Sequence, residues 1–78
     1  MHKIIIYSAP LCVYCKMVKQ YLDEKKIEYT ELDVSSDDKA KDEMIEKSGQ
    51  LGIPVVDIDG KIIIGFDKPA INAALNIS

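Results

Sequence analysis

The chain has 78 residues, of which 47% are apolar, and it carries a formal net charge of −3. This length fits a single domain over residues 1–78 with one small core, so a substrate must be handled at the surface or in a shallow groove. The lysines are interspersed with acids, the apolar runs are short and no secretion signal begins the chain, so we expect a cytoplasmic protein with no nucleic-acid or membrane partner.

The first half of the chain predicts a strand, a helix and a second strand. Lys3–Tyr7 is rich in isoleucine, and β-branched side chains favour a buried strand. After a loop, apolar residues recur at helical spacing and predict a helix over Val13–Lys26. Its inward face is expected to carry Val13, Met17, Tyr21 and Leu22. Glu28–Val34 predicts a strand that lies parallel to the first, because the connection is a right-handed crossover.

A second helix is expected to begin at Ser35–Asp38 and to end near Gly49. A serine side chain can accept an unpaired backbone N–H at a helix start, and the acids favour the positive end of the helix dipole. Glycine suits the left-handed position that follows a helix. The inward side of this helix is expected to carry Ala40, Met44 and Ile45.

The last third of the chain predicts a hairpin and a final helix. Pro54–Ile58 and Lys61–Ile64 flank Asp59-Gly60, and an Asp-Gly pair between apolar runs is a strong hairpin signal. Lys68–Asn76 predicts a helix that turns Ile71, Ala74 and Leu75 inward. The order β-α-β-α-β-β-α predicts an α/β protein with the minimal thioredoxin-like fold, in which three helices flank a four-stranded mixed sheet.

Cys12-Val13-Tyr14-Cys15 follows the first strand and opens the first helix. The thiolate is the form that attacks a disulfide, and a helix N-terminus within a C-x-x-C motif favours the thiolate. Cys15 lies three residues further along, on nearly the same helix face, so the two sulfurs can bond. In a reducing compartment such a pair indicates catalysis or metal binding rather than a structural bridge, and two inert core cysteines are the less favoured alternative.

The roles of the two cysteines follow from this setting. We expect Cys12 to attack a substrate disulfide and to form a mixed disulfide. Cys15 then attacks Cys12, releases the reduced substrate and leaves an intramolecular disulfide.

Pro54 stands just before the third predicted strand. Proline is the residue at which a cis peptide bond is accessible, and a cis bond would turn the Ile53 backbone toward the cysteines. The Ile53 N–H and C=O could then pair with an extended substrate segment. An ordinary trans proline at a strand start is the alternative, and the nearby cysteine motif favours the cis form.

With these motifs in place, nearly the whole chain resembles the glutaredoxin family and, within it, the small glutaredoxin-like redoxins that include the NrdH type. The blocks that carry the resemblance are 6–8, 12–16, 28–34, 42–49, 53–56 and 64–68. The resemblance implies that Cys12 is the nucleophile, Cys15 the resolving thiol and Pro54 a cis-proline. It also implies that Tyr14, Ile53, Phe66 and Asp67 line the groove that holds glutathione or a partner segment.

Three positions depart from the glutathione-using pattern. Ala9 stands where those proteins usually have a lysine, and Lys68 stands where they usually have a second acid after Asp67. Val13 replaces the usual proline of the motif and matches the NrdH type, which takes electrons from thioredoxin reductase. The reductant is therefore either glutathione as a co-substrate or thioredoxin reductase. The expected substrate is a protein that carries a disulfide, with ribonucleotide reductase, a peroxidase and a glutathionylated protein as the alternatives.

The main alternative is a metal or iron–sulfur carrier that uses the same cysteines. A closed zinc site needs four ligands, and this chain offers Cys12, Cys15 and a terminal His2 that we expect to be solvated. We therefore expect no resident metal, no tightly bound cofactor and a monomer. An interaction module with inert cysteines is the remaining alternative.

The other side chains are expected to have ordinary structural roles. Met17 and Met44 are assigned to the core. The residues assigned to packing with a hydrated hydroxyl group are Tyr7, Tyr21 and Tyr29. The residues assigned to a solvated helix face are Lys16, Lys19, Lys25 and Lys26.

Overall fold

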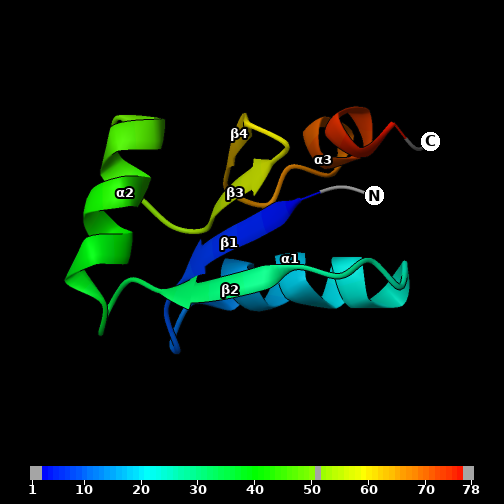
Figure 1. Cartoon of the computed structure of the whole chain (residues 1–78). Helices are drawn as coiled ribbons and strands as arrows, with labels where there is room; N and C mark the ends of the chain where they lie inside the picture. The colour runs from blue at the N-terminus through cyan, green and yellow to red at the C-terminus, as the bar shows by residue number, and fades with distance from the viewer. Residues whose placement is uncertain (1–2, 51, 77–78) are drawn as a thin grey trace.

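The computed structural model describes residues 3–50 and 52–76 of the chain. Its elements, in chain order, are β1 (Ile4–Ser8), α1 (Val13–Glu24), β2 (Thr30–Asp33), α2 (Asp38–Ser48), β3 (Val55–Ile58), β4 (Lys61–Ile64) and α3 (Lys68–Leu75) (Figure 1). All seven predicted elements are present in the predicted order. No helix in the described part has the length and apolar character that crossing a membrane requires.

The four strands form one mixed sheet in the order β2-β1-β3-β4. β1 is parallel to β2, with Ile6 opposite Glu31, and antiparallel to β3, with Ile6 also opposite Val56. β3 and β4 form the antiparallel hairpin. The predicted thioredoxin-like fold is therefore confirmed.

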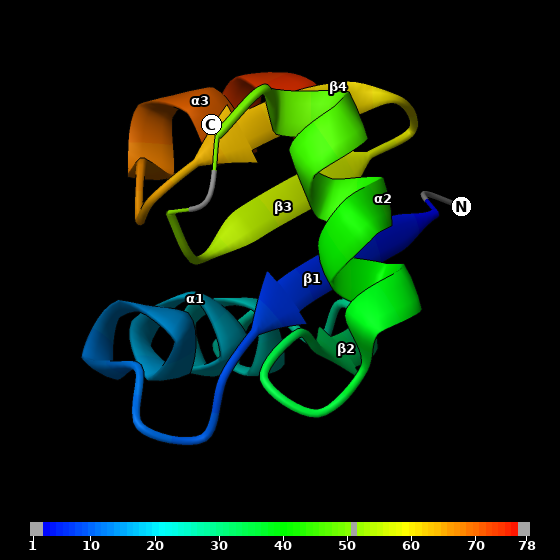
Figure 2. The ribbon, with the colours of Figure 1, turned by 90° about the vertical axis from the view of Figure 1, so that its left-hand side faces the viewer.

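Helices cover both faces of this sheet. α1 and α3 lie on one face and α2 crosses the other, as the two views together show (Figures 1 and 2). Side chains alternate along a strand, so Ile4 and Ile6 pack on the α1 and α3 side, whereas Ile5 and Tyr7 pack on the α2 side. A strand that is covered on both faces exposes neither face to water, so both sets of alternating side chains are apolar. This explains the unbroken apolar run of β1.

The hairpin and the end of α2 have the predicted backbone geometry. Asp59 and Gly60 both have positive φ, 52° and 92°, which fits the tight turn that joins two antiparallel strands. Gly49 follows α2 at a φ of 72°, in the left-handed region that glycine adopts without a Cβ clash.

Several element ends differ from the prediction. β1 spans Ile4–Ser8, one residue later at each end than predicted, and β2 begins at Thr30 rather than at residue 28. α1 ends at Glu24, because the chain turns at Lys25 and Lys26. β2 also ends at Asp33, one residue before the predicted end. Asp37, rather than a serine, caps α2 by accepting the N–H groups of Lys39 and Ala40. β3 begins one residue after Pro54, and Asn76 is the C-terminal cap of α3 rather than part of it.

The inward face of α1 was predicted correctly for Leu22 and incorrectly for Val13 and Met17. The helix buries Cys15, Val18 and Leu22, whereas Val13 is 68% exposed and Met17 is 38% exposed. Both sets of residues recur at helical spacing, and only the set that meets the sheet enters the core. The assignment of Met17 to the core was therefore wrong.

The second predicted core methionine, Met44, is buried between α2 and the sheet. It packs in the same cluster as Tyr7, which is also fully buried. The Tyr7 hydroxyl accepts a hydrogen bond of 2.8 Å from Lys47 Nζ, so the prediction of a hydrated hydroxyl was wrong for this residue. A buried phenol needs such a partner, and Lys47 supplies it.

Candidate active site

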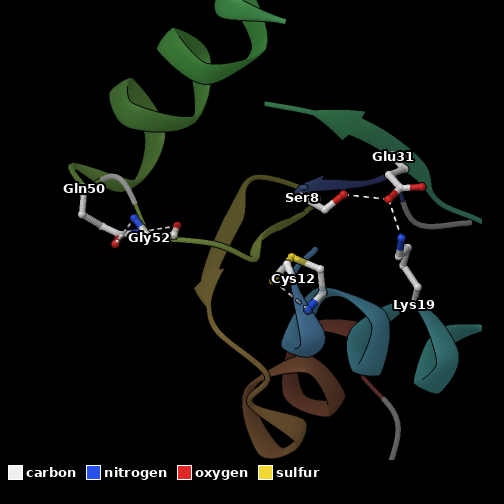
Figure 3. The surroundings of a disulfide bond; sticks show 7 residues. Ser8, Cys12, Lys19, Glu31, Gln50 and Gly52 are labelled. Carbon is white, nitrogen blue, oxygen red and sulfur yellow. Dashed lines mark hydrogen bonds and ion pairs between the residues drawn. A yellow bond between two sulfur atoms is a disulfide. The ribbon is translucent and has the colours of Figure 1, made fainter. Parts of the chain in front are cut away.

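Cys12 and Cys15 form a disulfide bond at the N-terminus of α1 (Figure 3). Their Cα atoms are 5.2 Å apart, within the usual range for a bridged pair. Cys12 is the N-cap residue and is partly exposed, whereas the Cys15 side chain is completely buried. An incoming substrate can therefore reach Cys12 and not Cys15.

A backbone N–H group lies against the Cys12 sulfur. The Cys15 N–H donates to Cys12 Sγ at 3.1 Å, and the first turn of α1 carries no acid. The loop that leads into the helix is closed by a hydrogen bond from the Cys12 N–H to the Ala9 carbonyl. This arrangement stabilises negative charge on Cys12 Sγ, because the Cys15 N–H and the positive end of the helix dipole face it.

Pro54 is buried and follows a cis peptide bond from Ile53. Its carbonyl accepts the Gly65 N–H at 2.8 Å, which ties the segment ahead of β3 to the turn after β4. Figure 2 shows the start of α1, the segment ahead of β3 and the start of α3 along one edge of the molecule. Ile53 is half-buried at this edge.

Phe66 and Asp67 lie in the turn that leads from β4 into α3. Phe66 packs edge-on against Tyr21 of α1, with ring centroids 6.0 Å apart, and Lys68 Nζ lies over both rings. Asp67 is the N-cap of α3 and accepts the Ala70 N–H at 3.2 Å.

The fold thus brings Ile53, Pro54, Phe66 and Asp67 to the edge at which α1 begins. Tyr14 lies in the first turn of α1 and is 61% exposed. Leu11, in the loop just before Cys12, is 95% exposed. Apolar side chains on both sides of Cys12 therefore face outward, where a partner could cover them.

A hydrogen-bonded chain beside the disulfide was missed by the sequence prediction. Ser8 is buried and its hydroxyl donates to Glu31 Oε2 at 2.7 Å, while Lys19 Nζ lies 2.6 Å from the same oxygen (Figure 3). The hydrogen bond from Lys19, followed by that from Ser8, holds the pKa of the Glu31 carboxyl below its usual value. Lys19 is thus an ion-pair partner and not simply part of a solvated face.

No sequence motif predicts these hydrogen bonds, because Glu31 is 23 residues from Ser8 and 12 residues from Lys19. Only the register of the parallel pair, with Ile6 opposite Glu31 and Ser8 opposite Asp33, brings Ser8 and Glu31 together.

A second missed contact lies in the segment that leads into Pro54. The Gln50 side chain makes two hydrogen bonds with the peptide groups of Gly52 (Figure 3). The sequence carries no signal for this contact beyond the glycine itself.

The described residues contain no group of three or more His, Cys, Asp or Glu side chains placed to hold a metal ion. The third potential ligand considered from the sequence, His2, lies outside the described residues. The two cysteines therefore remain the chemically distinctive groups of this site.

A thioredoxin-like sheet with a C-x-x-C pair at the start of α1 defines a thiol–disulfide oxidoreductase. Comparison with known proteins narrows this class, because the Glutaredoxin family profile matches residues 4–63. The chain belongs to the glutaredoxin family.

Two curated relatives and one solved structure illustrate this membership. A glutaredoxin-like 8.6 kDa protein of the rubredoxin operon of Clostridium pasteurianum is 46% identical over 88% of this chain and 92% of its own length. Glutaredoxin 3 of Escherichia coli strain K12 is 33% identical over 86% of this chain and 81% of its own length. The crystal structure of a mutant of the thioredoxin-like protein BC3987 is 33% identical, covers 100% of both chains and superposes with a TM-score of 0.91.

Proposed function

We propose that this protein is a dithiol electron carrier that reduces protein disulfides or glutathione mixed disulfides, with Cys12 as the attacking thiolate and Cys15 as the resolving thiol. The observation that carries this order of attack is the difference in exposure between the two sulfurs. Cys12 is partly exposed and accepts the Cys15 N–H, whereas Cys15 is completely buried.

The reaction balances in two exchange steps. Cys12 Sγ attacks one sulfur of the substrate disulfide, the S–S bond breaks, and the leaving thiolate takes a proton. Cys15, after losing its proton, attacks Cys12 Sγ, breaks the mixed disulfide and releases the second substrate thiol. The substrate gains two electrons and two protons, and the enzyme is left with the Cys12–Cys15 disulfide.

The groove residues have proposed roles in holding the substrate next to Cys12. Tyr14, Phe66 and Ile53 offer apolar contact, and the peptide groups of Ile53 can pair with an extended segment, as in strand addition. Pro54 fixes the backbone at that point. Asp67 offers the carboxylate oxygen that is not engaged with the Ala70 N–H.

The electron source that the charges favour is thioredoxin reductase rather than glutathione. Ala9 supplies no cation for a glutathione carboxylate. Lys68 places its ammonium over Tyr21 and Phe66, beside Asp67, where a second acid would attract the glutathione ammonium. Each change weakens glutathione binding by about 0–1 kcal/mol, the amount of an exposed ion pair.

A coupled assay with NADPH tests both the function and the reductant. The oxidised protein is offered to glutathione plus glutathione reductase, or to thioredoxin reductase, with a protein disulfide as acceptor. We expect faster NADPH consumption with thioredoxin reductase. Equal or faster turnover with glutathione would reject the proposed reductant, and no turnover with either would reject the proposed carrier function.

The proposed reaction needs no tightly bound cofactor, since both electrons reside on the thiol pair. The metal-carrier alternative requires ligands from a second chain or from free thiols, because two cysteines leave a four-ligand site incomplete. Absorption in the visible range and iron content of the protein purified without oxygen distinguish the two functions. A colourless monomer agrees with the electron carrier, and a brown dimer agrees with the cluster carrier.

A further inference from the structure

The Gln50 side chain closes on the backbone of Gly52 from both sides. Gln50 Nε2 donates to the Gly52 carbonyl at 3.0 Å, and the Gly52 N–H donates to Gln50 Oε1 at 2.7 Å. The Ser48 hydroxyl donates to the carbonyls of Met44 and Gln50, so the backbone of Gln50 is in turn tied to the end of α2. These two hydrogen bonds form the Gln50–Gly52 clamp.

The clamp sits directly ahead of the proposed substrate-binding backbone. Gly52 precedes Ile53, and Figure 3 shows the clamp on the chain segment that passes close to Cys12. The clamp occupies the Gly52 N–H and carbonyl. Within the part of the chain that the structure describes, the N–H and carbonyl of Ile53 take part in no hydrogen bond.

We propose that Gln50 is a positioning residue for the substrate, and this inference rests on the proposed function. By holding the peptide groups of Gly52, its side chain fixes the orientation of the next peptide groups, those of Ile53, before the substrate arrives. A binding edge fixed in advance costs less entropy to order on binding. Loss of the clamp therefore weakens substrate binding and leaves the sulfur chemistry unchanged.

The space around Gly52 shows how closely the Gln50 side chain packs on this backbone. A Cβ built on Gly52 lies 2.5 Å from Gln50 Oε1, and its next two neighbours are also Gln50 side-chain atoms. The φ angle of Gly52 lies outside the left-handed region, so the backbone itself accepts an L-residue. A Cβ at this position therefore displaces the flexible end of the Gln50 side chain and opens the clamp.

This dependence makes a double-mutant cycle decisive. Gly52→Ala should displace the Gln50 side chain and so mimic its loss, and Gln50→Met removes both hydrogen bonds while keeping a side chain of similar length. If the clamp is the shared cause, Gln50→Met with Gly52→Ala has the effect of either single change. Lys41→Met, on the exposed side of α2, is the matched control for an added surface methionine.

The experiment measures turnover and binding separately. Turnover uses an oxidised two-cysteine peptide as acceptor, and binding uses the same peptide with a non-reducible thioether bridge. We expect Gln50→Met and Gly52→Ala each to raise KM and the peptide Kd roughly three- to tenfold, the loss that one or two net hydrogen bonds would give. We expect kcat of both variants to stay within twofold of the value for the unchanged protein. The same limit applies to the equilibrium constant of thiol–disulfide exchange, which reports the reduction potential, and to KM and Kd of Lys41→Met.

The possible results separate this inference from the proposed function. Unchanged Kd values for Gln50→Met, additive losses in the double variant, a changed reduction potential, or no peptide binding by the unchanged protein would each overturn the inference. Peptide binding that depends on Gln50 in a protein without turnover would support the inference and reject the proposed function.

Discussion

Lys47 on α2 and Asp57 on β3 form an ion pair in which Nζ lies 2.7 Å from Oδ2, on the face of the sheet opposite α1. The same ammonium donates to the Tyr7 hydroxyl and lies 5.2 Å from the centre of its ring. One cation therefore connects α2 with β3 and with the C-terminal end of β1. β1 is the strand that leads to Cys12.

Lys47→Met should destabilise the fold, because it leaves the mostly buried carboxylate of Asp57 without its cation. The pair retains some solvent contact, so we expect a loss of about 1–3 kcal/mol rather than the full cost of breaking a deeply buried pair. Urea unfolding measures it. Glu43→Gln is the control, since the half-exposed Glu43 carboxylate also faces Lys47, at 3.3 Å. A loss as small as the control's, within about 1 kcal/mol, would contradict a stabilising role for the Lys47–Asp57 pair.

The hydrogen bonds of Glu31 with Ser8 and Lys19 should affect the stability of the fold at acid pH. The folded pKa of Glu31 is lowered, first by Lys19 and then by Ser8, so its stabilisation is present above the unfolded value of about 4.3 and is lost as pH falls through the folded pKa. NMR titration of the Glu31 carboxyl carbon should give a midpoint below that of an unfolded glutamate. Lys19→Met should move the midpoint upward, and an unmoved midpoint would show that the lysine does not set it.

The two cysteines should be distinguishable by substitution. Cys12→Ser should abolish turnover, because no exposed thiolate remains to attack. Cys15→Ser should accumulate a mixed disulfide with the protein substrate, since nothing resolves it, and should retain only the reaction with glutathione. Mass spectrometry of the intact protein after incubation with the substrate detects the adduct. The assigned order of attack would be reversed if the Cys12→Ser variant formed an adduct on Cys15 while the Cys15→Ser variant formed none on Cys12.

The charges at positions 9 and 68 should control the use of glutathione. Ala9→Lys supplies the missing cation, and Lys68→Asp supplies a second acid beside Asp67. Each change should improve kcat/KM in the glutathione-coupled assay by up to about fivefold, the equivalent of about 1 kcal/mol. Lys41→Asp, a charge reversal on α2, controls for net charge. If the double variant showed no increase in kcat/KM with glutathione, residues 9 and 68 would not control the use of glutathione.

Local backbone chemistry could be predicted from the sequence because it depends on single residues. The turn at Asp59-Gly60 and the end of α2 at Gly49 each follow from what one residue type permits. The fold follows from the order of these elements. The family relationship then links Cys12, Cys15 and Pro54 to a single chemistry.

Contacts between distant elements could not be predicted in this way. α1 carries two apolar stripes, one through Val13 and Met17 and one through Val18 and Leu22, and the sequence does not say which stripe meets the sheet. Pairs such as Lys47 with Asp57 depend on strand register, which no local pattern encodes.

The central position of β1 has a consequence for the motions that the redox site can undergo. β1 pairs with β2 on one edge and β3 on the other, and it is covered by helices on both faces. Its amide hydrogens should exchange with solvent only through global unfolding, whereas those of the sheet edges β2 and β4 exchange through smaller openings. Because Cys12 follows this strand after the short loop 9–11, the cysteine that is oxidised and reduced is attached to the strand that should open last.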